Sequence, residues 1–235
     1  MLYDLHIHSC LSPCAEDDMT PATVAGMAKL AGADLIAITD HNSARNLPAA
    51  EIACKAYGLR LLPGIEVNTE EEIHLLCYFP SVQKAMQMSD ALYAALPALP
   101  YDPAVWGRQL VCNEDDAVLD AVEKLLTGAV QMNIYQAVRL CQSLGGVAVP
   151  AHADKDSFSL LSVLGFCPED LPFTAVEMAD PAQYPALAAK HFLPAGCEIL
   201  HSSDAHQLAD IARHLQPLAA WLRHRSAATA GPTIR

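Results

Sequence analysis

The chain has 235 residues, 52% of them hydrophobic, and a formal net charge of −13 at pH 7. This length fits one domain of barrel size, or a core domain with a sizeable insertion. Its apolar stretches are short and interrupted, and the start MLYDLHIHS has neither the basic segment nor the apolar core of a signal peptide. We therefore expect no membrane segment and a cytoplasmic location. The acidic charge, with no basic stripe, argues against bulk nucleic acid as a partner.

The eight cysteines form no CxxC pair and no compact disulfide framework. Scattered cysteines of this kind are typical of reduced thiols that pack as small hydrophobic side chains. Cys10 and Cys14 are the exception, because they follow His6 and His8 closely in the sequence. Their spacing alone leaves a metal or redox role open without establishing one.

Strands and helices alternate along most of the chain. Thr20 and Pro21 fit the N-cap and first turn of a helix. The hydrophobic pattern predicts strands at 2–8, 34–39, 59–67 and 72–79, with helices at 20–31 and 47–57 between the first three. This alternation implies parallel pairing, and we expect a parallel barrel of about seven strands.

The region 81–130 interrupts the alternation and is predicted to be an insertion between the fourth and fifth strands. We expect helices in it at 82–96 and 116–126. The alternation returns with a helix at 134–144 and strands at 147–151, 174–177 and 198–202. The tail 223–235 is expected to be weakly ordered, which leaves residues 1–222 as a single domain.

Histidine and acidic residues lie at or just after the ends of these predicted strands. Side chains alternate along a strand, so His6 and His8 point the same way. In a parallel barrel the strand ends meet at one mouth, where imidazoles and carboxylates can hold several divalent metals. The pattern therefore predicts a multinuclear metal site suited to hydrolysis, formed by His6, His8, Asp40, His41, Glu66, His74, His152, Asp204 and His206.

These segments together resemble the PHP (polymerase and histidinol phosphatase) family of metal-dependent phosphoesterases. The matching segments are DLHIHS at 4–9, TP at 20–21, AITDHN at 37–42, PGIEV at 63–67, EIHLLCY at 72–78, PAH at 150–152 and SSDAH at 202–206. They follow the family's order and cover nearly all of the predicted strands. The resemblance implies an α/β fold, a distorted (β/α)7 TIM-like barrel, with an insertion between the fourth and fifth strands.

The resemblance also implies a trinuclear site with two to three divalent ions (zinc, manganese or iron). One ion would take His6, His8, Glu66 and Asp204, and Glu66 would bridge to a second ion completed by His74 and His152. A third would take His41 and His206 with one residue from the loop after the first strand. The family commonly has Ser-Asp-Gly in that loop, and counting back from Thr20 puts Glu16 at the ligand position here, with Asp17 and Asp18 as alternatives.

The implied reaction is hydrolysis of a small phosphomonoester or nucleotide by a metal-activated hydroxide, with Asp40, His41, Glu66 and Asp204 as the catalytic set. Ions of this kind clamp the attacking and leaving oxygens and lower the pKa of bound water, so no protein nucleophile is needed. Asp40, beside His41, is a candidate to orient that ring. Cations near the mouth would bind the substrate phosphate, and the candidates are Lys155, Arg45 and Arg108.

Two other classes stay open. An amidohydrolase-type metal hydrolase also begins with HxH on a barrel strand, but that class typically bridges its metals with a modified lysine, and the fourth strand here offers His74. A catalytically silent metal-binding domain would be expected to have lost ligands, whereas eight of nine are in place and the ninth has acidic candidates. The sequence selects no natural substrate, no single metal and no oligomeric state.

Overall fold

The computed structural model describes residues 1–99, 101–171, 173–190 and 192–217. The tail predicted at 223–235 lies outside the described residues. Within them the fold is mixed α/β, and no helix is both long and apolar enough to cross a bilayer. The strands are arranged in four hydrogen-bonded sheets, and a single closed barrel sheet is not found among the described residues.

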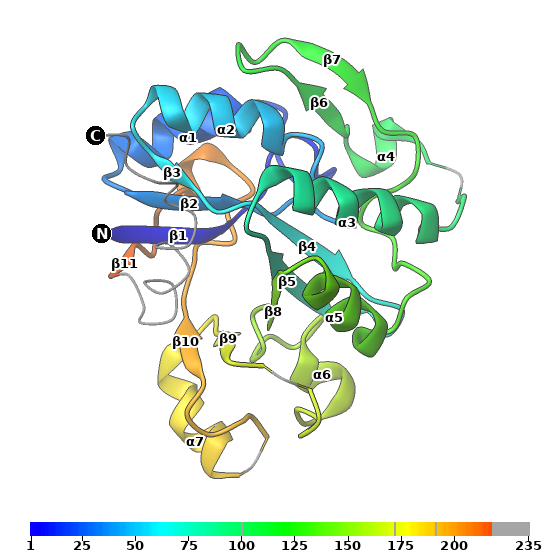
Figure 1. The fold of residues 1–235 in the computed structure, drawn as a ribbon, viewed down its shortest axis with the longest axis vertical. Helices are drawn as coiled ribbons and strands as arrows, with labels where there is room; N and C mark the ends of the chain where they lie inside the picture. The colour runs from blue at the N-terminus through cyan, green and yellow to red at the C-terminus, as the bar shows by residue number, and fades with distance from the viewer. Residues whose placement is uncertain (100, 172, 191, 218–235) are drawn as a thin grey trace.

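The first half of the chain builds two sheets and the helices that cover them. Parallel pairing joins β1 to β2 and β2 to β3, and β11 adds antiparallel to β1. Helices α1 and α2 lie side by side next to this sheet (Figure 1). The elements are β1 (Leu2–Ile7), α1 (Pro21–Leu30), β2 (Leu35–Ile38), α2 (Leu47–Ala56), β3 (Arg60–Leu61), β4 (Gly64–Asn68), β5 (His74–Tyr78) and α3 (Val82–Ala95).

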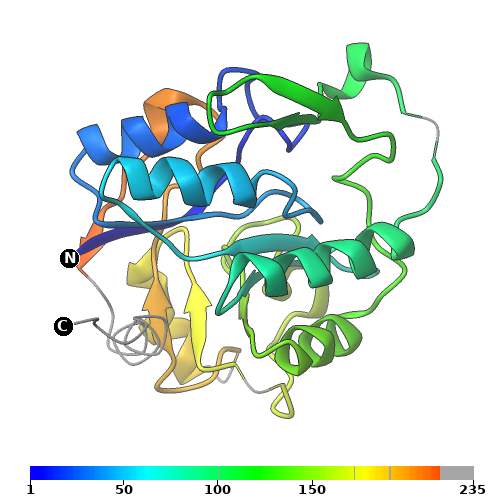
Figure 2. The same cartoon turned by 45° about the horizontal axis from the view of Figure 1, so that its top comes forward.

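The second half completes the β4–β5–β8 sheet and adds two small sheets, β6–β7 and β9–β10. Helices α3 and α5 pack against β4, β5 and β8 (Figure 2). The elements are α4 (Pro103–Trp106), β6 (Leu110–Cys112), β7 (Val118–Ala121), α5 (Ile134–Ser143), β8 (Val147–Pro150), α6 (Leu160–Leu164), β9 (Ala175–Glu177), a 3-10 turn (Pro181–Gln183), α7 (Tyr184–Ala189), β10 (Glu198–Leu200), a second 3-10 turn (Leu208–Asp210) and β11 (Gln216–Pro217).

Two expectations about the strands are wrong, one about the extent of the third strand and one about strand pairing. The predicted third strand is divided into β3 and β4 around Pro63, which has no N–H to donate to a ladder. Strand β5 pairs antiparallel with both β4 and β8. Parallel neighbours need a crossover of about a dozen residues or more, whereas only residues 69–73 separate β4 from β5, so these two strands form a hairpin.

The insertion contains a hairpin where a helix was expected at 116–126. Strands β6 and β7 pair antiparallel and are set apart from the other sheets (Figure 1). The Asn113 side chain accepts hydrogen bonds from the N–H groups of Asp115 and Ala117, which closes the connecting turn. The other predicted helix of this region, near 82–96, is present as α3.

The hairpin also caps the first helix of the fold. Helix α1 begins at Pro21 as predicted, but Thr20 makes no side-chain capping bond. The Asp116 carboxylate accepts hydrogen bonds from the N–H groups of Ala22 and Thr23 at 2.8 and 3.0 Å instead. A carboxylate at a helix N-terminus satisfies free donors and faces the positive end of the helix dipole, so the insertion stabilises the main body of the fold.

Two layers of buried apolar side chains hold the elements together. The larger layer lies between helices and strands and includes Val24, Ala50 and Ala137. The smaller one gathers side chains from β1, β2, β5, β8, β9 and β10, among them Tyr3, Leu35, Leu76, Val149 and Leu200. Strands from different sheets therefore share one interior.

Gly107 leaves no room for a side chain where the insertion packs against the loop after β1. Its φ is +93°, and a Cβ placed there would lie 1.9 Å from the carbonyl oxygen of Pro13. We expect Gly107→Ala to lower the free energy of unfolding by about 1–3 kcal/mol, because the side chain adds backbone strain and forces the Pro13 loop away. Urea denaturation measures the change.

Gly32→Ala is the control, because Gly32 also has a positive φ (+96°) but has open space around its Cβ position. Equal losses of stability in the two variants would show that the contact with Pro13 does not matter.

Candidate metal centre

The carboxylate of Glu66 is the centre of the site. Glu66 lies in the middle of β4 and its side chain is 1% exposed. Its Oε1 atom is 3.0 Å from His74 Nδ1, and its Oε2 atom is 3.2 Å from His41 Nδ1. Five imidazoles in all lie within 3.4 Å of it, those of His6, His8, His41, His74 and His152. The structure thus brings together residues from β1, β4, β5 and the loops after β2 and β8.

Several of these contacts lack hydrogen-bond geometry. Glu66 Oε1 and one ring nitrogen each of His41, His74 and His152 are buried without a hydrogen-bond partner among the described residues. A buried polar atom left unsatisfied costs about 1–3 kcal/mol, so native structures rarely leave several together. Buried polar atoms that lie close together without hydrogen-bonding one another are typical of metal ligands.

The hydrogen bonds of His6 and His8 leave their other ring nitrogens free to bind a metal. Glu177 Oε2 lies 2.9 Å from His6 Nδ1, and Ser12 Oγ lies 2.9 Å from His8 Nδ1. If these Nδ1 atoms donate, each neutral ring carries its lone pair on Nε2. The two Nε2 atoms are only 3.2 Å apart, so they face one point.

Asp40 holds the loop after β1 rather than the His41 ring. It accepts hydrogen bonds from Ser9 N, Ser9 Oγ and Ser12 Oγ at 2.7, 2.6 and 2.8 Å. Because the Ser12 hydroxyl donates to Asp40, it is free to accept from His8 Nδ1 and from the backbone N–H of His41. The expected link from Asp40 to the His41 ring is therefore replaced by a link to His8 through Ser12.

The segment after β10 brings Asp204 and His206 beside β1. Backbone hydrogen bonds link Ala205 to both His6 and His8. Asp204 Oδ1 lies 3.3 Å from His6 Nε2 and 3.4 Å from His8 Nε2. Asp204 has a φ of +51° and His152 a φ of +27°, conformations that are strained for residues other than glycine and cluster at functional sites.

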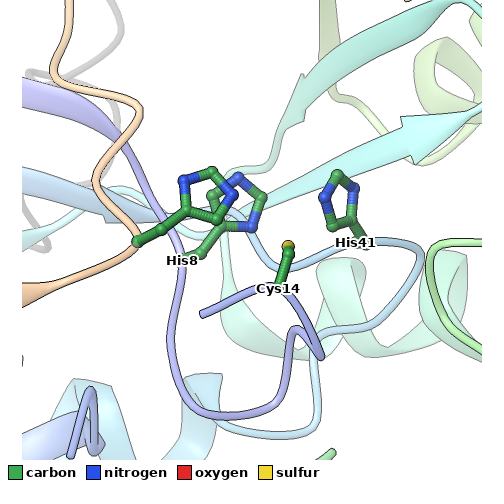
Figure 3. A group of neighbouring side chains, drawn as sticks. His8, Cys14 and His41 are labelled. Atoms are coloured by element: carbon green, nitrogen blue, oxygen red, sulfur yellow. The ribbon is translucent and has the colours of Figure 1, made fainter. Parts of the chain in front are cut away.

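The loop after β1 brings Cys14 to the site in place of Glu16. His8, Cys14, His41 and His206 each offer a ligand atom, and these atoms lie within 4.8 Å of one another. Figure 3 shows His8, Cys14 and His41 of this group. Glu16 is exposed and belongs to none of the ligand groups found among the described residues, and neither do Asp17 and Asp18. The count from Thr20 missed Cys14 because the loop folds back on itself, with Ala15 N bonded to Ser12 O.

Of the three expected phosphate-binding cations, only Lys155 reaches the site. Its ammonium lies 2.6 Å from Asp204 Oδ2. Arg45 instead pairs with Asp120 of β7, and Arg108 pairs with Asp17. Both arginines therefore tie the insertion to the main body, and the structure does not bring them to the ligand cluster.

Glu177 and Ser12 are functional residues that the sequence reasoning missed. Glu177 accepts from His6 Nδ1 and from the backbone N–H of His152, so it fixes two ligand-bearing segments at once. Glu177 is the last residue of the predicted strand 174–177, and most of the predicted ligands also lie at strand ends. This position could have identified it. For Ser12 the sequence offers no comparable signal.

The charges of the site call for cations. Burial alone would lower the pKa of His8, but Asp204 and Glu66 raise it to about 9. Burial alone would raise the pKa of Glu66, but the surrounding imidazoles, His74 first, hold it well below its usual range. Either protonated histidines or metal ions can balance the negative charge of these buried carboxylates. Metal binding displaces the protons from the histidines. The donor set of imidazoles, carboxylates and one thiol fits zinc, iron or manganese.

The fold is mixed α/β, and the donor set is that of a protein that binds divalent metal ions. The PHP domain model matches residues 4–145, more than half of the sequence, and the chain belongs to the PHP domain family. The predicted family is thereby confirmed.

Known proteins resemble the chain in sequence and in fold. A 5'-3' exoribonuclease from Haemophilus influenzae is 34% identical over 77 residues, which cover 32% of this chain and 27% of that protein. The lesion-specific endonuclease PfuEndoQ from Pyrococcus furiosus matches in fold with a TM-score of 0.66 and 19% identity, over 99% of this chain and 56% of that one. An amidohydrolase from Chromobacterium violaceum has a TM-score of 0.61 and 22% identity, over 96% of each chain. The chain thus spans about a quarter of its curated relative.

These resemblances correct one prediction. Bulk nucleic acid was argued against on the net charge of −13, and that exclusion is wrong, since two of these proteins are an exoribonuclease and an endonuclease. Net charge describes the whole surface, whereas divalent ions at a site attract phosphate locally whatever the overall charge.

We expect Ser12→Ala to weaken metal binding by about 10–100-fold, because His8 loses the hydrogen bond that orients its ring. Competition with a chromogenic chelator measures the affinity. Ser143→Ala, at the exposed end of α5, is the control and should bind metal as the unaltered protein does. Unchanged affinity in Ser12→Ala would refute the orienting role.

Proposed function

We propose that this chain hydrolyses phosphoester bonds of nucleotides, either free or at the end of a nucleic acid strand, with two or three divalent ions. One observation carries the proposal: a single buried carboxylate, Glu66, is contacted by five imidazoles from four parts of the chain. Native structures rarely leave so many buried polar atoms without a hydrogen-bond partner, and bound divalent ions would give these atoms partners.

The ligands divide into three groups around Glu66. His6, His8, Glu66 and Asp204 would hold one ion, and Glu66 would share a second with His74 and His152. The third would lie among His41, His206 and the loop after β1. The contacts of Glu66 and Asp204 with the ring nitrogens support this division.

When bound, such ions supply Lewis acidity that activates water and stabilises charge on the phosphoryl oxygens. The residues of the chain position and balance this chemistry. Burial opposes ionisation of Asp204, but His6 and His8 hold the pKa of its carboxyl well below its usual range, so it stays ionised. Lys155 places a positive charge at the more exposed edge of the cluster, beside Asp204, where it can bind a substrate phosphate.

An exposed aromatic side chain beside the ligand His74 favours a nucleotide over a simple phosphomonoester. The Phe158 ring stacks on His74 with centroids 4.9 Å apart, yet the residue is 43% exposed. Nucleobases stack on aromatic rings placed in this way. The similarity to an exoribonuclease supports the same substrate class.

A small phosphomonoester is the second candidate, since Lys155 and the metal ligands need no base to bind a phosphate. Amide hydrolysis is less well supported, because the amidohydrolase match is a match of fold. A panel of 5'-labelled oligoribonucleotide, nucleoside 5'-monophosphate, p-nitrophenyl phosphate and amide substrates separates these classes.

We also propose that the three sheets outside the insertion together form the distorted seven-stranded barrel expected of the family, with 81–130 as an insertion in one domain. Isolated backbone pairings link β1 to Ala205 and join His41 to Glu66 of β4. The shared interior of six strands supports the same arrangement. In such a barrel the strand ends would form a single mouth for the metal ligands.

We expect Glu66→Gln to bind fewer metal ions and to release phosphate or nucleotide no faster than the no-enzyme blank, because the amide cannot bridge two cations. Elemental mass spectrometry and the substrate panel give the two readouts. Glu169→Gln serves as the control, because Glu169 is exposed and lies far from Glu66 in the sequence. Full turnover in Glu66→Gln would rule out the proposed site.

We expect Phe158→Ala to lower kcat/KM for nucleotide substrates by about 5- to 150-fold, the loss of one base stack. Hydrolysis of p-nitrophenyl phosphate should change much less. Phe166→Ala removes another exposed phenylalanine and should affect neither substrate. A proportional loss on both substrates would mean that Phe158 supports His74 and does not contact a base.

A further inference from the structure

Four side chains from three segments meet beside Glu66. Cys14 comes from the loop after β1, His41 from the loop after β2 and His206 from the segment after β10, while His8 directly follows β1. Each offers one ligand atom, and the four atoms lie within 4.8 Å of one another. In Figure 3 the Cys14 sulfur points toward the rings of His8 and His41.

We propose that Cys14 is a thiolate ligand of one metal ion and completes a set of one cysteine and two histidines with His41 and His206. The inference rests on the proposed metal-dependent function and deepens it. It assigns the ligand for which the sequence suggested only acidic candidates.

The histidines near Cys14 have ring nitrogens available for a cation, and this observation does not depend on Cys14. His41 is 5% exposed, and its Nδ1 atom has no hydrogen-bond partner among the described residues. His8 borders this group, but its Nδ1 is engaged by Ser12 and its Nε2 faces His6, Glu66 and Asp204, so we leave it on the neighbouring ion. Cys14 is therefore close to nitrogen donors, and imidazole nitrogen and thiolate sulfur are both common zinc ligands.

The position of Cys14 is fixed from outside the cluster. Leu110 N donates to Cys10 O at 2.8 Å, and Gly107 packs against Pro13. On the other side of Cys14, the backbone N–H of Glu16 donates to His206 O at 2.9 Å. The insertion and the segment after β10 thus hold both flanks of the loop, and the Glu16 side chain remains exposed.

A thiolate changes which metal the site prefers. Thiolate is a soft ligand that suits zinc, iron(II) and cobalt(II), whereas magnesium and manganese prefer carboxylate oxygen. Binding also requires the thiol to lose its proton, so metal binding should release a proton from Cys14. We therefore expect zinc or cobalt to bind this position more tightly than manganese.

Cobalt substitution tests the proposal by a readout other than activity. Protein reconstituted with cobalt(II) should show the near-ultraviolet thiolate-to-cobalt charge-transfer band. Cys14→Ser should lose the band, and Cys14→Asp should lose it while keeping the bound cobalt. Cys197→Ser, which alters a cysteine in the loop before β10, should keep the band.

A second measurement uses the unaltered protein, so the test does not depend on how the variants fold. Cys14 is accessible to solvent, and bound zinc should slow its alkylation by iodoacetamide, followed by peptide mass spectrometry. A band that persists in Cys14→Ser, or alkylation that zinc does not slow, would overturn the thiolate assignment. Cobalt bound without any band would overturn the assignment and leave the proposed function intact, whereas no cobalt bound at all would contradict both.

Discussion

A buried carboxylate in contact with five imidazoles is the constraint on which the rest of the structure depends. An ionised group away from water is tolerated only with cationic partners and satisfied hydrogen bonds. Glu66 has the partners, yet several of the surrounding donor atoms bond to nothing else among the described residues. Divalent ions resolve this conflict, because one ion satisfies several lone pairs and neutralises the carboxylates at once.

The surrounding fold is organised to hold those donor atoms in place. Glu177 and the Asp40–Ser12 pair orient His6 and His8. Pairing of Ala205 with β1 brings Asp204 and His206 alongside. The insertion, through Gly107, holds the loop that carries Cys14. Each of these contacts joins segments distant in sequence, so the site and the tertiary fold form together.

Much of the site could be predicted because strand ends leave a clear pattern. His6, His8, Glu66, His74, His152, Asp204 and His206 all lie at or just after predicted strands, and the structure brings them together. Loop conformation has no such periodicity, which is why Glu16 was chosen over Cys14. The antiparallel β4–β5 hairpin and the β6–β7 strands were missed for related reasons. Both hairpins are formed by short turns, and the apolar pattern of a sequence does not show whether neighbouring strands run parallel or antiparallel.

The acidic net charge was a misleading guide to partners, because a metal centre can reverse the local potential that a substrate meets. The most direct measurement of the central claim is the metal content of the full chain, purified without a tag, by elemental mass spectrometry. We expect two to three divalent ions per chain, removed by a chelator and restored by added zinc or manganese. A chain that holds no divalent ion, even after reconstitution, would contradict the account.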